Sequence, residues 1–507
     1  MNLKLNQKRT YLVGFAFMSI MLFWTVYDLL IAKMLVDNFG LGQTASGFVM
    51  ALDNILALFL LPLFGKISDK TRTKYGKRTP FIIIGTLIAA ILFVGVAFFD
   101  LAQQLAVTKF GYSEILFDEL TNVFYYTKDG NLVTGTLEVT GNLVNIPNIV
   151  KSYVAEHRAA SIFSDITMKS PGLLIGFIVV LFFVLLAMGI YRSPAVSLMP
   201  DVTPKPLRSK ANAVINLLGT VGGGVSYLLV ALLASGPVFD KTGYVAIFAL
   251  TGIFMIAIIA VFFFTVKENK WSEEMLSITK EYNLDSLQID EEGVDIKQYT
   301  EDEKMPKDVR RSFILILAAV VLWFMGYNAA TSKFSVYAFN HLGLQSFSLP
   351  PLVGTVAAAI SFIPIGLLSQ KVGRRRMILV GIVFLTLAMV GAIFITADTQ
   401  FLMFVIMGLV GVSWATINVN SYPMVVEMSK HGNIGVYTGY YYTASMGAMI
   451  VTPILSGALM DITKYYPSLF IYSAIFMGLA FIPMFFVKHG EPVHTDQIVE
   501  HDVTAAE

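Results

Sequence analysis

Three ionisable side chains stand inside apolar segments, where they could bind and release a cation. Asp28, Asp53 and Arg192 each interrupt such a segment. A charge at the centre of a membrane-spanning helix costs about 2.5–3.5 kcal/mol, so it generally faces a cavity or a partner. Substrate or solvent there could switch the proton affinity of a carboxylate, which is coupling chemistry. The alternative is a static pair that holds helices together, and the sequence does not indicate which aspartate would pair with Arg192.

Amide and aromatic side chains lie in the same kind of segment. Asn216 shares a helical stripe with Asn212 and Thr220, and Trp414 begins a second stripe at four-residue spacing. Aromatic faces beside amides suit a sugar, whose C–H face stacks while its hydroxyls form hydrogen bonds. The predicted substrate-binding residues are Trp24, Asn54, Asn216, Trp323, Tyr327, Asn328, Trp414, Asn418 and Tyr422. For any single aromatic, packing or interface anchoring is the commoner role.

Two glycine-containing basic loops follow corresponding segments of the two halves. Residues 65–78 read GKISDKTRTKYGKR, and residues 366–376 read GLLSQKVGRRR. Glycine permits tight turns, and the basic cluster can contact helix carboxyl ends, as a gating loop requires. The predicted gating residues are Gly65, Asp69, Arg72, Gly76, Arg78, Gly373 and Arg374. The alternative is that these loops only determine topology.

Composition indicates which elements position these residues. Of 507 residues 56% are hydrophobic and 14% are charged, and the mean hydropathy is +0.68, so a bilayer is the expected solvent. Twelve apolar runs are long enough to span it: 11–36, 44–64, 79–99, 171–199, 210–236, 242–267, 308–336, 347–369, 375–397, 401–427, 432–460 and 466–488. The prediction is an all-α polytopic membrane protein with the major facilitator fold, which consists of two six-helix bundles.

The predicted domains follow from these runs. They are an amino-terminal bundle (1–267) with an outside insertion (100–170), an acidic linker (268–307), a carboxy-terminal bundle (308–490) and a tail (491–507). The insertion, with β-type residues around 131–144, would be a lid or a solvated excursion. Basic residues gather on one side, which predicts a multi-pass protein of the plasma or inner membrane with both termini cytoplasmic.

Several function classes are disfavoured. A net charge of +1 gives no indication of nucleic acid, and the absence of cysteine removes disulfides and thiol chemistry. No phosphate-binding loop, nucleophile elbow or metal-ligand spacing is present. We expect no enzyme activity, no cofactor, no metal and no ATP-driven pumping, and we expect a monomer.

Four segments resemble a known family. Residues 65–81, 192–204 (RSPAVSLMPDVTP), 208–219 (RSKANAVINLLG) and 411–427 (GVSWATINVNSYPMVVE) resemble the glycoside-pentoside-hexuronide cation symporters. The closer resemblance is to the branch of plant sucrose symporters and their animal and bacterial relatives, with Asp28 as the acid of the first helix and Arg192 as the arginine of the fourth. The resemblance implies inward symport of a disaccharide (sucrose, maltose or similar) or another glycoside with a proton.

The chain departs from the melibiose carriers of that family. Their paired aspartates in the second helix would fall on Ala57 and Leu61, so sodium coupling is less favoured than proton coupling. Two other functions stay open: a facilitator-type exporter of amphipathic compounds, which would favour an apolar cavity, and a sugar sensor that does not transport.

Overall fold

The computed structural model describes residues 5–118, 123–134, 146–204, 207–281, 306–428 and 434–490. Within these ranges, 12 helices are long and apolar enough to cross a membrane. They are α1 (Gln7–Lys33, continued by the π-helical turn η1, Met34–Asn38), α2 (Gln43–Lys70), α3 (Thr79–Lys109), α5 (Gly172–Val202), α6 (Arg208–Leu233), α8 (Val245–Thr265), α10 (Lys307–Ser332), α12 (Leu349–Val372), α13 (Arg374–Ile393), α14 (Leu402–Glu427), α15 (Ile434–Thr463) and α16 (Ser468–Phe486). The predicted all-α membrane fold is confirmed.

One predicted boundary was wrong. The third apolar run was expected to end at residue 99, but α3 continues to Lys109. Asp100 and Gln103, which interrupt the hydropathy, are buried and hydrogen-bonded: Asn38 donates to Asp100 Oδ1 (2.7 Å) and Gln103 donates to Thr167 (3.0 Å). A buried polar residue with a partner does not end a helix, so the insertion begins after Lys109.

The packing of the helices repeats between the halves. The helix α2 packs on α5 and α3 on α8, while the corresponding pairs of the second half are α12 on α14 and α13 on α16. The largest contacts between the halves are those of α2 with α15 and of α6 with α12. At the first crossing Gly47 and Gly457 permit close approach, because a Cβ on either would overlap a backbone carbonyl of the other helix.

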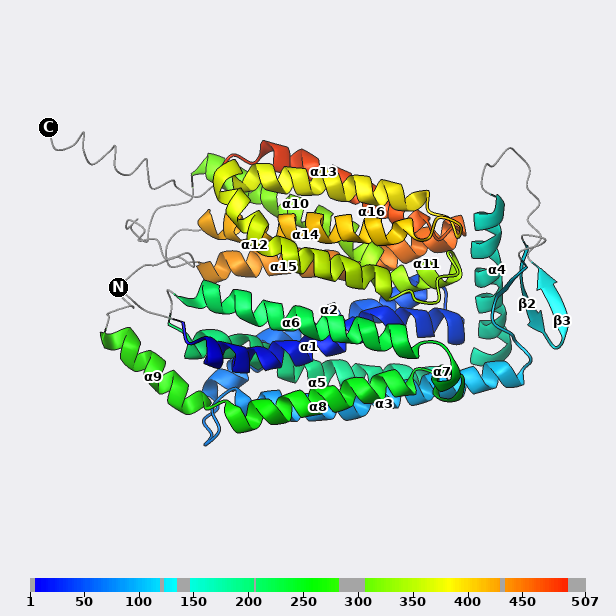
Figure 1. Cartoon of the computed structure of the whole chain (residues 1–507), viewed down its shortest axis with the longest axis horizontal. Coiled ribbons are helices and arrows are strands. Elements are labelled where there is room, and N and C mark those ends of the chain that lie inside the picture. Colours follow the sequence, from blue (N-terminus) through cyan, green and yellow to red (C-terminus); the bar gives the residue numbers. More distant parts are fainter. Residues whose placement is uncertain are drawn as a thin grey trace.

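The two ends of the molecule differ (Figure 1). One end, here called the basic end, holds the amino terminus, the α2–α3 loop and the helix α9 (Glu268–Glu281). The other, the insert end, holds the strands β1 (Leu116–Asp118), β2 (Val123–Lys128) and β3 (Asn131–Thr134), and the helix α4 (Ile146–Ile162), which runs transversely across the helix ends. The short helices α7 (Pro237–Thr242) and α11 (Phe334–Asn340) and the π-helical turn η2 (Phe163–Thr167) also lie there.

The insertion contains a small antiparallel sheet in the order β1-β2-β3. Asp129 and Gly130 have positive φ (50° and 77°), as a two-residue hairpin turn between β2 and β3 requires. Only residues 131–134 of the predicted β-type stretch 131–144 form a strand, and residues 135–145 lie outside the described ranges.

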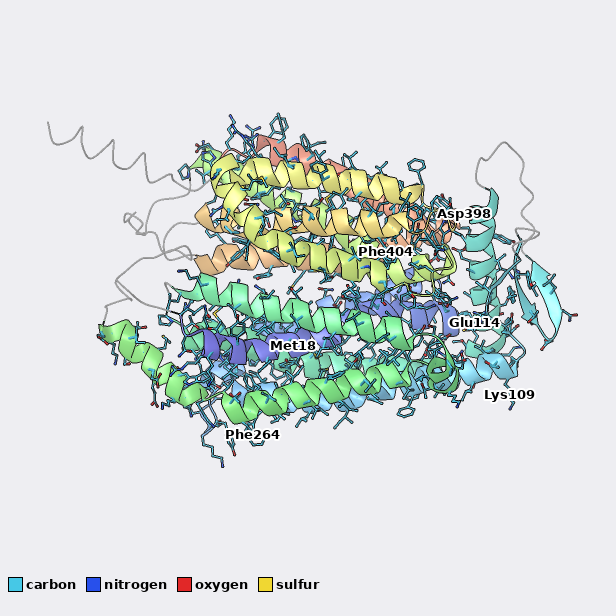
Figure 2. All side chains as sticks on the ribbon, in the orientation of Figure 1. Met18, Lys109, Glu114, Phe264, Asp398 and Phe404 are labelled. Carbon is cyan, nitrogen blue, oxygen red and sulfur yellow. The ribbon has the colours of Figure 1, made fainter. Side chains whose placement is uncertain are left out.

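The linker residues 268–281 form α9, which packs against α5, and residues 282–305 lie outside the described ranges. Large apolar side chains cover the outside of the helical halves, as Phe264 on α8 illustrates (73% exposed, Figure 2). Such a surface fits lipid rather than water.

Candidate functional site

The three predicted coupling residues come together between α1, α2 and α5. Asp28 is exposed although both its chain neighbours, Tyr27 and Leu29, are buried in the core. Arg192 interacts electrostatically with Asp53 and with Asp28. Asp28 also interacts electrostatically with Tyr227 and Tyr327 of other helices, so its exposed side chain faces an open space between the helices rather than the lipid. This space is here called the cavity.

Arg192 is not locked to either carboxylate. Neither Asp28 nor Asp53 forms a direct ion pair with it among the described contacts. Instead its guanidinium lies 5.5 Å from the centre of the Trp24 ring, a cation–π contact. The backbone and side-chain amides of Asn54 both donate to Asp53 Oδ1 (2.6 Å each). Among the described residues, the structure therefore does not contain the static Asp–Arg ion pair that was the alternative interpretation.

The opposite wall is aromatic and comes from the second half. The rings of Tyr327 (α10) and Trp414 (α14) are stacked, with centroids 3.7 Å apart and planes inclined by 2°. Phe324 contacts the edge of Trp414 at 5.3 Å. Tyr422 lies beside Tyr441, at 5.6 Å between ring centroids. Tyr327, Trp414 and Tyr422 are half-buried, and together these rings form an aromatic face.

Two residues that the sequence analysis missed join the walls. Tyr227 of α6 interacts electrostatically with Asp28 and lies beside Thr355 of α12, and Tyr327 interacts with both Tyr227 and Asp28. Tyr442 of α15 interacts with Arg192 across the interface between the halves. A signal existed for Tyr227, because it continues the stripe of Asn216 at helical spacing.

Other predicted binding residues lie in different places. Trp323 is fully buried in the hydrophobic core, so packing explains it. Asn216 is exposed on α6, three turns from Tyr227 toward the basic end. Asn328 and Asn418 are half-buried. Two buried polar atoms, Trp24 Nε1 and Asn328 Oδ1, have no hydrogen-bond partner in the described structure, which favours a ligand or water there.

The first predicted gating loop is a network centred on Arg78, which is 4% exposed. Its Nε donates to Asp201 of α5 (2.8 Å), and its Nη atoms contact Asp69 and Ser68. It also donates to the carbonyl of Gly65 (3.3 Å). All these partners belong to the amino-terminal half, so the network ties α2 to α5.

A carboxylate of α9 organises the same loop. Glu268 is 2% exposed and accepts from the amides of Lys77 (2.8 Å), Arg78 (2.9 Å) and Thr79 (2.8 Å), at the start of α3. An anion at a helix amino terminus is favourable. Gly76 has φ of 121°, and a side chain there would overlap Glu268.

The remaining gating candidates differ in burial. Arg72 is exposed and donates to the carbonyls of Asp69 (3.0 Å) and Thr71 (3.2 Å). In the second half Gly373 has φ of 96° and ends α12, and Arg374 is 6% exposed.

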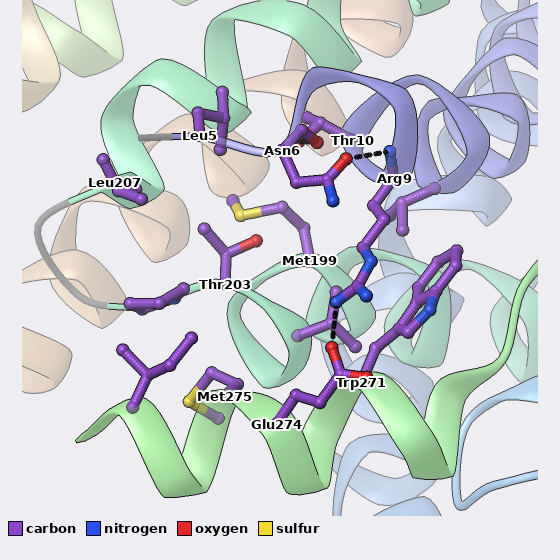
Figure 3. A pocket seen from close by; sticks show the side chains of 14 residues that line it. Leu5, Asn6, Arg9, Thr10, Met199, Thr203, Leu207, Trp271, Glu274 and Met275 are labelled. Carbon is purple, nitrogen blue, oxygen red and sulfur yellow. Dashed lines mark hydrogen bonds and ion pairs between the residues drawn. The ribbon is translucent and has the colours of Figure 1, made fainter. Parts of the chain in front are cut away.

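A separate cavity of about 90 Å³ lies at the basic end between α1, α5 and α9 (Figure 3). Arg9 pairs there with Glu274 and lies 5.3 Å from the Trp271 ring. Arg9 is about 28 Å along α1 from Asp28, at about 1.5 Å per residue, so this cavity is separate from the coupling residues. Among the described side chains, no group of three metal-ligating residues occurs.

Fold and cavity define a polytopic α-helical membrane protein with a polar cavity between two six-helix halves. The family model described as Major Facilitator Superfamily matches residues 159–448 and 352–503, and the model described as MFS/sugar transport protein matches residues 12–126. The chain belongs to the major facilitator superfamily. Family and fold point to a transporter rather than an enzyme.

Individual proteins resemble the chain over different extents. The lactose permease of Lactobacillus helveticus is 43% identical over 60 residues, which span 11% of this chain and 9% of the permease. A D-xylose-proton symporter structure has a TM-score of 0.60 at 14% identity and covers 96% of this chain and 98% of its own. The partially occluded, inward-open xylose transporter XylE of E. coli has a TM-score of 0.60 at 14% identity, with 95% and 98% covered. At such identity the structures support the fold alone.

Proposed function

We propose that the protein imports a disaccharide or related glycoside together with a proton, by alternating access. The observation that carries this proposal is the arrangement of the cavity. Asp28, Asp53 and Arg192 form a charged wall without direct ion pairs, opposite the stacked rings of Tyr327 and Trp414. Such a cavity combines a protonatable group with a stacking face for a sugar.

Each wall has a role in this mechanism. The sugar ring stacks on the Trp414 face, and its hydroxyls bond to Arg192 and to the unpartnered atoms of Trp24 and Asn328. Asp28 is the principal proton carrier because it is the more exposed carboxylate, and Asp53 assists it. The match to the family model described as MFS/sugar transport protein and the similarity to a segment of a lactose permease support a sugar as substrate.

The conformation fits an inward-open state. The hydrogen bonds that join the halves at α2, α11 and α15 lie at the insert end. At the basic end, the network of Arg78 and Glu268 stays within the amino-terminal half and its linker. With the basic end in the cytoplasm, as the positive-inside rule predicts, the cavity opens inward and both termini are cytoplasmic.

The test is uptake of a panel of radiolabelled disaccharides into proteoliposomes with an imposed inward proton gradient, with and without a protonophore. Accumulation that the protonophore abolishes supports the proposal and identifies the sugar. Counterflow without accumulation would contradict proton coupling. Absence of sugar movement, in protein shown to be inserted, would favour an exporter or a sensor.

A further inference from the structure

The insert end is closed by polar contacts between the halves. Asp461 of α15 accepts from the backbone amides of Gln43 (2.8 Å) and Thr44 (2.7 Å), the first residues of α2. The N-cap residue of α2, Gly42, supplies no side-chain cap. A carboxylate of one half therefore caps a helix of the other, which is favourable only while the halves touch.

A buried lysine reinforces this closure. Lys333, at the end of α10, is 0% exposed, and its Nζ donates to the carbonyl of Gln43 (2.6 Å) and to Ser46 Oγ (2.8 Å). Asn340 of α11 donates to Asp37 Oδ1 (2.7 Å). These polar contacts between the halves are hydrogen bonds that water can replace when the halves separate.

The transverse helix α4 is anchored to the amino-terminal half. Arg158 Nε donates to the carbonyl of Ser113 (2.7 Å), and its Nη1 donates to the carbonyl of Asp37 (3.2 Å). Gly40, with φ of 70°, lies so close to Ala159 that a side chain there would overlap the helix backbone. These contacts hold α4 on the end of α1.

The same helix also contacts the carboxy-terminal half. Ser152 Oγ is buried, lies 3.2 Å from His341 Nδ1, and accepts from the backbone amide of Tyr466 (3.3 Å). Farther along α4, Glu156 lies 2.9 Å from Lys464 Nζ as an ion pair. Figure 1 shows α4 lying across the ends of both halves.

We infer that α4 is an outer clasp: it stays on the amino-terminal half throughout the cycle, and its contacts through Ser152 and Glu156 must break before the cavity opens at the insert end. The inference rests on the proposed alternating access and adds a control element to it. The clasp favours the inward-open state, so weakening it shifts the population toward the outward-open state.

The first test needs no sugar. Because the chain contains no cysteine, a single cysteine at the closed interface can report its opening. Met50, 4% exposed, lies one turn after Ser46 on the face of α2 that contacts the carboxy-terminal half. Met50→Cys therefore reports opening of the insert end to a thiol reagent that cannot cross the membrane. Ser152→Ala removes the acceptor of the buried Tyr466 amide, and this loss matters only while α4 contacts the carboxy-terminal half, so labelling should accelerate at least about fivefold. The matched control is Ser113→Ala, whose hydroxyl bonds to Thr127 within the insertion. Equal labelling rates in the two variants would overturn the inference that α4 is a clasp. This result would not depend on which solute the protein transports.

The second test replaces ion pairs by bridged cysteines. Glu156→Cys with Lys464→Cys spans the halves, whereas Lys128→Cys with Asp165→Cys replaces a pair inside the insertion (2.5 Å). After reaction with the same flexible bifunctional thiol reagent, the first protein should lose more than about nine-tenths of its uptake and the second should keep it. Continued uptake by the protein bridged across the halves would show that α4 need not part from the carboxy-terminal half, against the inference.

Discussion

Replacing Asp28 with asparagine separates coupling from sugar binding. The substitution keeps the shape of the side chain and removes its titratable proton. One proton that moves down 100 mV supplies about 2.3 kcal/mol, and about 1.4 kcal/mol corresponds to tenfold, so symport of one proton sustains roughly 50-fold accumulation. Asp28→Asn should reduce this ratio to about one. Counterflow should persist, because it needs binding and alternation of the loaded carrier but no net proton movement.

The assay compares accumulation and counterflow in the same proteoliposomes. Asp398→Asn, which removes an exposed carboxylate distant from the cavity, is the matched control and should accumulate normally. Accumulation by Asp28→Asn close to the unmodified protein would refute the assignment of the proton to Asp28 and shift it to Asp53. Loss of counterflow with preserved membrane insertion would place Asp28 in the sugar site instead.

Three further outcomes follow from the geometry. Trp414→Ala removes the stacking face and should weaken sugar affinity about tenfold in counterflow, whereas Trp323→Phe, in the core, should lower only the melting temperature. Glu268→Ala leaves three backbone amides at the start of α3 without the carboxylate that accepts from them. The substitution should lower the melting temperature of the detergent-solubilised protein by several degrees, whereas substitution of an exposed carboxylate should not. Burial raises the pKa of Glu156 from 4.5 to about 7, against the lowering effect of its lysine. Because the cost of burying the carboxylate outweighs its ion pair with Lys464, the state in which α4 contacts both halves binds this proton more tightly than a solvated glutamate does. The contact is therefore strongest below about pH 4.5 and weakens as pH rises through about 7. Relative to the labelling rate of the same cysteine in unfolded protein, which corrects for the thiolate fraction, labelling of Met50→Cys should rise over this window by at most tenfold per pH unit, and Glu156→Gln should remove this rise.

The fold was predictable because the bilayer imposes one constraint on each segment: every span must be an apolar helix. Hydropathy therefore located all twelve spans. It failed at the end of α3, where Asp100 and Gln103 are polar and yet buried, since their partners Asn38 and Thr167 are distant in the sequence.

The site was less predictable, because helical phase places a residue on a face but does not indicate what that face contacts. Intramembrane charge pointed to Asp28, Asp53 and Arg192, which the structure brings together. The same argument from residue type selected Trp323, which lies in the core. Tyr227 and Tyr442 reach the cavity from α6 and α15, and only the packing between the halves places them there.

The division of chemistry between the halves suggests how the proposed symport would couple the proton to the sugar. The charges belong to the amino-terminal half and the stacked rings to the other, so a sugar held by both favours their closure. If the halves close around a charged Asp28 and exclude water, the closed state is destabilised by several kcal/mol, since no direct ion pair compensates the lost hydration of the carboxylate. Protonation removes that cost, and the sugar replaces the water around Arg192. Closure is then favourable when proton and sugar are both bound. It is also favourable when both are absent and Arg192 forms an ion pair with a carboxylate. A carrier that changes state only when fully loaded or empty is a symporter.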